Sequence, residues 1–185
     1  MFICHVALQG CLTLQDVPYG LTADTGGHIK YLLELADASA KDPSVHRIDL
    51  VTRGFVDSRL GEKFRPGESE RDHKVRLVRI ADGEEAYLPK EDLRHRHGEL
   101  CDSFIAYLRG LHRKPDLIHA HYADAGILAR RAKEVFGIPY VFTGHSLGAV
   151  KREANGRTND ELERLACLNP SAQLSNLLLQ TPVIP

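Results

Sequence analysis

The fold of this chain is indicated most clearly by residues 115–143, which are PDLIHAHYADAGILARRAKEVFGIPYVFT. The apolar residues after the leading proline predict a short strand over 116–120. A helix is predicted over 124–136, because a glycine and then a proline follow it, as they commonly follow a helix end. A second strand is predicted over 139–143. A helix joining two short strands in this way is typical of a parallel α/β sheet.

The same alternation continues through the rest of the chain. Apolar patterns predict further strands over 2–8, 47–52 and 74–80, and further helices over 26–41, 90–111 and 149–164. The polar stretch 54–73 is predicted to be an exposed connection. The loop over 10–25 is long for a compact domain, and such loops usually carry function. The fold class is therefore α/β, a Rossmann-like doubly wound and mainly parallel sheet covered by helices on both faces. Ligands are expected at the carboxyl ends of its strands.

Composition excludes several classes of protein. The chain has 185 residues, with 24 basic and 25 acidic side chains and a formal net charge of −1. Proteins that bind nucleic acid or anionic membranes usually have a basic excess, so neither partner is expected. No apolar run approaches the ~18 residues of a membrane span, and the first residues lack the features of a signal peptide. The four cysteines form no C-x-x-C pair, which predicts reduced thiols in a cytoplasmic protein.

A single domain is expected over residues 1–164. Residues 165–185 contain no Lys, Arg, Asp or Glu, although charged residues are frequent just before them. Such a change in composition indicates either a segment covered by a partner or a chain end unrelated to the parent gene, and the second interpretation is favoured. We therefore expect residues 165–185 to form an uncharged, atypical tail.

The most specific local signal is Asp-Thr-Gly-Gly-His at residues 24–28, after the first strand and at the start of a helix. A helix N-terminus offers unpaired backbone N–H groups and a partial positive charge. Gly26 and Gly27 carry no side chains, so a phosphate could approach these amides closely. The alternative is a glycine-rich turn that only caps the helix. No G-x-G-x-x-G follows the first strand, so an NAD site has little support.

A second signal is Gly-His-Ser-Leu-Gly at residues 144–148, which matches the G-x-S-x-G nucleophile elbow of α/β-hydrolases. That fold needs an acid and then a histidine after the serine, whereas all ten histidines lie at or before residue 145. The hydrolase interpretation is therefore less favoured. His145 is instead expected to face the ligand crevice at a strand end, the alternative being a structural histidine.

Histidines and lysines follow other predicted strands. His119 and His121 lie on one face of a strand and could bind zinc together with Asp124. No nearby cysteine pair completes such a site, so hydrogen bonding to sugar or phosphate is favoured and no metal is expected. Lys90 and Lys151 each follow a strand-end loop, where a lysine could supply a point charge for a phosphate.

A similar pair occurs in Arg-His-Arg-His at residues 94–97, which is predicted to be a solvated helix face.

Four motifs together resemble the sucrose-phosphate synthase and sucrose synthase family of retaining glycosyltransferases, which have the GT-B fold. They are DTGGHIKY at 24–31, YLPKEDL at 87–93, PDLIHAHYADAG at 115–126 and VFTGHSLG at 141–148. The resemblance covers roughly residues 1–164 and implies the N-terminal, acceptor-binding Rossmann-like half of such an enzyme. The C-terminal half that mostly holds the nucleotide sugar is missing from this chain and is an implied partner.

The resemblance implies transfer of glucose from UDP-glucose to fructose 6-phosphate, with no metal or other cofactor. The roles it implies are donor diphosphate binding by Gly26 and Gly27, contact of the catalytic His145 with the donor sugar, and acceptor binding by His28, Lys90, His121, Tyr122 and Lys151. Within the acceptor set, the two lysines match those that hold the 6-phosphate. His28 stands where the family usually has glutamine. The alternative is a truncated, non-catalytic module that binds sugar phosphates.

Overall fold

The structure is a computed structural model that describes residues 1–145, and these residues form one six-stranded sheet with the order β3-β4-β2-β1-β5-β6. The strands are β1 (Phe2–Val6), β2 (Arg47–Arg53), β3 (Gly67–Glu70), β4 (Val75–Ile80), β5 (Leu117–His121) and β6 (Tyr140–Thr143). The helices are α1 (Gly27–Ala40), α2 (His97–Gly110) and α3 (Tyr122–Phe136), with short 3-10 turns η1 (Glu62–Phe64) and η2 (Leu93–Arg96). All strand pairs are parallel except β3 with β4.

The predicted mainly parallel α/β sheet is confirmed, with two local corrections. The stretch 54–73 was expected to be only a connection, but it contains η1 and the edge strand β3. All four residues of β3 are exposed, so no apolar alternation announces it. The helix expected over 90–111 begins as η2 and becomes α-helical at His97. The helix predicted over 149–164, the domain limit at 164 and the tail 165–185 lie outside the described residues.

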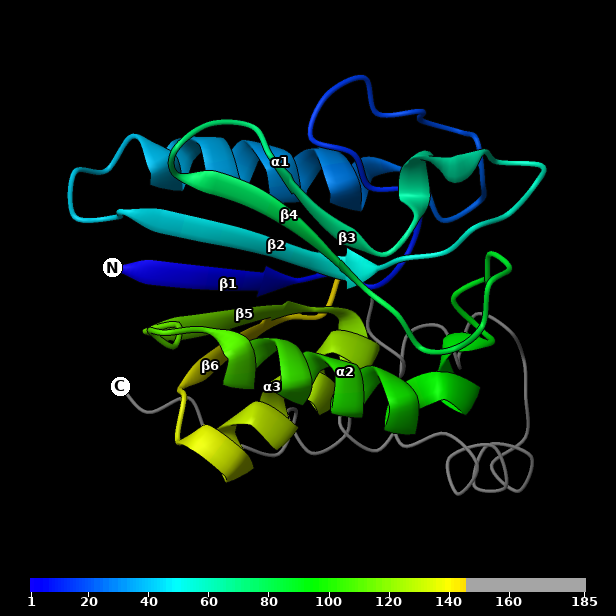
Figure 1. Cartoon of the computed structure of the whole chain (residues 1–185). Helices are drawn as coiled ribbons and strands as arrows, with labels where there is room; N and C mark the ends of the chain where they lie inside the picture. Colours follow the sequence, from blue (N-terminus) through cyan, green and yellow to red (C-terminus); the bar gives the residue numbers. More distant parts are fainter. Residues whose placement is uncertain (146–185) are drawn as a thin grey trace, which may run out of the picture.

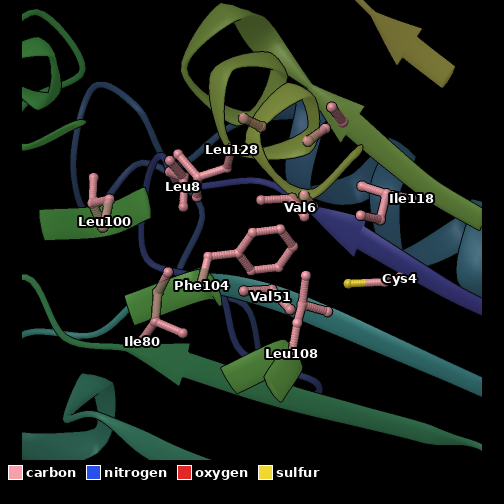
Figure 2. Close-up of a cluster of buried hydrophobic side chains, with 14 of the residues drawn as sticks. Cys4, Val6, Leu8, Val51, Ile80, Leu100, Phe104, Leu108, Ile118 and Leu128 are labelled. Atoms are coloured by element: carbon pink, nitrogen blue, oxygen red, sulfur yellow. The ribbon is translucent and has the colours of Figure 1, made fainter. Parts of the chain in front are cut away.

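Each face of the sheet has its own core. Helix α1 covers one face, and α2 and α3 cover the other (Figure 1). Val6 of β1 packs with Phe104 of α2 and Leu128 of α3 in the larger core, and Figure 2 shows the Phe104 ring among its neighbours. Ile3 and Ala7 belong instead to the core beneath α1. Because successive strand residues point to opposite faces, His5 lies on the α1 face.

The other expectations from composition concern cysteines and membranes. Cys4, Cys11 and Cys101 are free thiols, and burial raises the pKa of each, whereas Cys167 lies outside the described residues. None of the helices within residues 1–145 has the length and apolar character needed to cross a bilayer. The cytoplasmic location and the absence of a nucleic-acid partner stay predictions.

Candidate functional site

The helix N-terminus at Gly26 and Gly27 is unobstructed. Gly26 is the N-cap of α1, with an extended backbone (φ −145°), and no side chain in the described part of the chain caps the helix. A Cβ added at either glycine would contact nothing within 4 Å among residues 1–145. Neither the backbone conformation nor internal packing therefore requires glycine here. The space beside both glycines is free, and the uncapped first-turn amides of α1 could bind an anion.

Four histidines meet close to this helix end. His5 of β1 and His119 of β5 are partners in the parallel register, and His121 lies two residues further along β5 on the same face. His5 Nδ1 is 3.3 Å from His121 Nε2, and His121 Nδ1 is 3.0 Å from His145 Nε2. The rings of His119 and His121 are stacked, with their centroids 4.2 Å apart. His121 is therefore the centre of the cluster.

Burial keeps these imidazoles uncharged. Burial and then the neighbouring His119 lower the pKa of His5 to about 3. Burial, followed by the surrounding histidines, lowers the pKa of His121 to about 2. Burial also lowers the pKa of His119 and of His145. At neutral pH each ring thus carries one N–H donor and one lone pair, which suits hydrogen bonding to hydroxyl groups.

Aromatic rings complete the wall next to His145. The rings of His28 and Tyr122 lie with their centroids 6.3 Å and 4.7 Å from that of His145, and Tyr31 of α1 lies at 5.3 Å. Tyr122 and His145 have positive φ angles of 68° and 51°. Such conformations are uncommon for residues other than glycine, and they often occur at functional sites. Both residues are held at the carboxyl ends of adjacent strands, β5 and β6.

Lys90 is held beside the glycine turn by Asp24. Its Nζ is 3.3 Å from Asp24 Oδ1, and its backbone N–H donates to Asp24 Oδ2 at 3.0 Å. The Tyr87 hydroxyl donates to the same oxygen at 2.9 Å. Burial opposes the charge of Lys90, but the Asp24 carboxylate raises the pKa of this lysine above its usual value. Asp24 precedes Gly26 by only two residues, so its pairing with Lys90 holds this cation near the glycine turn.

Gly10 makes this arrangement possible. It has a φ of +79°, and a Cβ at this position would lie 2.3 Å from the carbonyl oxygen of Asp24. A side chain here would push Asp24, near the end of the loop over 10–25, away from position 10.

The structure does not support the less favoured alternative of a metal site with Asp124, and it corrects one expectation about residues 94–97. Asp124 does not join His119 and His121, because His97 Nε2 lies 2.7 Å from its Oδ1 and Gln9 Nε2 donates to its Oδ2 at 3.1 Å. The segment 94–97 was expected to be a solvated face, which is wrong for His97, since it makes this partly buried contact with Asp124. Gln9 was not foreseen, because a lone glutamine after a strand carries no local signal.

A buried ion pair holds the loop that carries Lys90. Arg53 Nε donates to Asp82 Oδ2 at 2.8 Å, and its other nitrogens donate to the carbonyl oxygens of Glu84 and Ala86 at 2.7 and 2.9 Å. Arg53 and Asp82 are each only 3% exposed. The start of the 82–90 loop is therefore tied to the carboxyl end of β2.

The structure brings together most of the residues expected from the sequence. Seven of the expected site residues surround one end of the sheet: Gly26, Gly27, His28, Lys90, His121, Tyr122 and His145. Lys151 lies outside the described residues. His5 and Gln9 were missed, and Asp24 was quoted in a motif without a role.

This arrangement and the fold define a class of protein. The family model of the glycosyl transferase 4-like domain matches residues 26–174, and the chain belongs to this family. Its mainly parallel α/β sheet matches that of GT-B glycosyltransferases. The solved sucrose-phosphate synthase from Thermosynechococcus elongatus superposes with a TM-score of 0.64 at 24% identity, over 90% of this chain and 39% of that one.

Curated relatives of known name match this chain more narrowly than the family model does. Sucrose-phosphate synthase 4 from Arabidopsis thaliana is 33% identical over 89% of this chain, and the probable sucrose-phosphate synthase 4 from Oryza sativa subsp. japonica is 32% identical over 89%. The chain is thus similar to sucrose-phosphate synthases over most of its own length. It spans 18% of the length of each of these two relatives.

Proposed function

We propose that this chain forms the acceptor side of a retaining glycosyltransferase that moves glucose from UDP-glucose to fructose 6-phosphate. One observation carries the proposal: an unobstructed helix N-terminus, a pair of neutral histidines and a fixed lysine lie at the same end of the sheet. These groups suit a diphosphate, sugar hydroxyls and a phosphate, respectively. Sucrose-phosphate synthases among the relatives support this choice of donor and acceptor.

Each group has a distinct part in the proposed transfer. The amides at Gly26 and Gly27 stabilise the negative charge that develops on the leaving diphosphate, because their dipoles are already oriented. If His121 Nδ1 donates to His145 Nε2, a neutral His145 holds its proton on Nδ1. That N–H is then the group His145 offers to a hydroxyl of the donor sugar.

Lys90 recognises the acceptor. Its ammonium is paired with the buried Asp24 carboxylate, so the 6-phosphate shares the cation rather than meeting a free one. Bringing two sugars together in a closed crevice supplies much of the remaining acceleration. The nucleotide-sugar donor must also be bound by a second Rossmann-like half, on the side opposite Gly26, Gly27 and His145.

The chain by itself is expected to fold but not to turn over. A half-site remains open to water, which weakens every electrostatic contact that a closed crevice would strengthen. Calorimetry with purified residues 1–185 should detect little affinity for UDP-glucose, and a coupled UDP-release assay with fructose 6-phosphate should stay at background. Steady UDP release by this chain would contradict the proposed division of the site. A chimera that joins the chain to the C-terminal half of a sucrose-phosphate synthase tests the alternative. If the chain binds sugar phosphates but this chimera is inactive, the non-catalytic module is favoured.

Lys90→Met is expected to weaken selection for the phosphorylated acceptor. Loss of a charge-assisted phosphate contact costs roughly 1.5–3 kcal/mol, whereas methionine preserves most of the apolar stem. In the active chimera, the ratio of kcat/KM for fructose 6-phosphate to that for fructose should fall by roughly 10- to 150-fold. Lys151→Met should act in the same direction.

The matched control for Lys90 is Lys41→Met, which removes an exposed lysine at the far end of α1. This control should leave the ratio unchanged. An unaltered ratio in Lys90→Met would refute the assignment of Lys90 to the 6-phosphate.

A further inference from the structure

Two histidines of the cluster have no part in the proposed transfer. His5 is 2% exposed, and its Nε2 is buried without a hydrogen-bond partner among residues 1–145. His119 is half-buried beside it. Buried polar atoms are nearly always satisfied, and an unmatched one commonly marks a missing water or ion. A water on that side would satisfy Nε2, whereas the other ring nitrogen of His5, Nδ1, faces His121 Nε2.

We propose that His5, His119 and His121 form a binding site for a divalent transition metal of the Zn²⁺ type. One ligand nitrogen from each of the three residues lies within 4.8 Å of those of the other two. His5 Nδ1 and His121 Nε2 are 3.3 Å apart. Two imidazole nitrogens bound tetrahedrally at 2.0–2.1 Å from zinc are separated by about 3.3–3.4 Å. The separation of these two nitrogens therefore matches that of two ligands of one zinc ion.

The surrounding residues orient the rings as ligands require. The Thr143 hydroxyl is 2.7 Å from His119 Nε2, which leaves Nδ1 of His119 available. His145 is 3.0 Å from His121 Nδ1, which leaves Nε2 of His121 available on the side of His5. A metal-bound histidine usually makes such a hydrogen bond through its other nitrogen. The third ring nitrogen lies within 4.8 Å of the other two, so it needs to approach by at most about 1.5 Å to complete the triad.

The donor set selects the class of metal. The three ligands are neutral imidazoles, which suit zinc, copper or nickel, whereas magnesium and calcium prefer oxygen ligands. Asp124 is occupied by His97 and Gln9, and Cys4 packs in the core on the opposite face of the sheet. Three protein ligands leave a fourth position for water, as in an open zinc site. His119, being only half-buried, lies on the accessible side.

Zinc titration of the tag-free 185-residue chain tests the proposal. After chelator treatment, the chain should bind one equivalent of Zn²⁺ in competition with a chromophoric chelator, and Co²⁺ should give the visible absorption of a tetrahedral site. His5→Asn and His119→Asn should each lower the Zn²⁺ affinity by at least tenfold. His73→Asn, which removes an exposed histidine, is the control and should bind as the unmutated chain does.

A measurement on the unmutated chain covers the case in which a buried variant fails to fold, which circular dichroism would reveal. Crystals soaked in Zn²⁺ should show an anomalous scattering peak within bonding distance of His5 and His121. Unchanged Zn²⁺ affinity in both folded variants would overturn the proposed site, and so would an equal loss of affinity in His73→Asn. An anomalous peak found only at surface histidines would overturn it as well.

Discussion

Replacing His145 with alanine in the active chimera is expected to lower kcat about 10²- to 10³-fold, the loss typical of removing one preorganised polar group from a transition state. His145 is held by His121 at 3.0 Å and by the rings of Tyr122 and Tyr31, so its imidazole is already positioned before substrate binds. Initial rates of UDP release with saturating fructose 6-phosphate measure the effect. The affinity for the acceptor should change much less than kcat.

The control for His145 is its neighbour Ser146, which lies outside the described residues. The glycosyltransferase interpretation makes this serine dispensable, whereas the hydrolase interpretation makes it the nucleophile. Ser146→Ala should therefore keep most of the transferase activity. Covalent labelling of Ser146 by a fluorophosphonate probe, or equal losses in the two variants, would support the hydrolase instead.

Arg53→Met should lower the free energy of unfolding by about 3 kcal/mol, because the buried Asp82 carboxylate loses two hydrogen bonds from Arg53. Its remaining cationic neighbour is the more distant Arg96, whose Nε lies 3.6 Å away. Arg53 also donates to the carbonyl oxygens of Glu84 and Ala86, so the variant additionally releases the loop that leads to Lys90. Urea unfolding of the 185-residue chain, followed by circular dichroism, gives the change. A shift in the midpoint without a change in slope would indicate that the loss is one of stability alone.

The double variant Arg53→Met/Asp82→Leu tests the cause. Replacing both charges by apolar side chains removes the buried carboxylate that Arg53 no longer balances, so the double variant should be more stable than Arg53→Met alone. Arg65→Met breaks an exposed pair with Glu62 and should leave the midpoint unchanged. A double variant as unstable as the sum of its single variants would contradict this explanation.

Much of the fold could be predicted because local patterns encode it. The apolar alternation of β4 and the helical stripe of α2 are visible in the chain, and a glycine and a proline mark the end of α3. The edge strand β3 could not be predicted, since its residues are all exposed and polar. Its place depends on main-chain hydrogen bonds to β4, which most residue types permit.

The candidate site divides along the same line. Gly26, Gly27 and His145 were recognisable because strand ends and helix starts carry function in parallel sheets, and because the motifs around them are specific. Asp24 and Lys90, whose pairing holds the Lys90 ammonium in place, are 66 residues apart in the chain. Neither segment carries a sequence signal that predicts its contact with the other.

The sequence by itself determined the kinds of element, their order and the family, because these follow from hydrophobic periodicity and short motifs. Only the tertiary structure decided that β1 lies beside β5 and that His5 therefore meets His121, 116 residues away. Strand order and register depend on how both faces of the whole sheet pack against α1, α2 and α3, a property of many distant residues at once. For that reason the neighbours of His5 could be identified only from the assembled sheet.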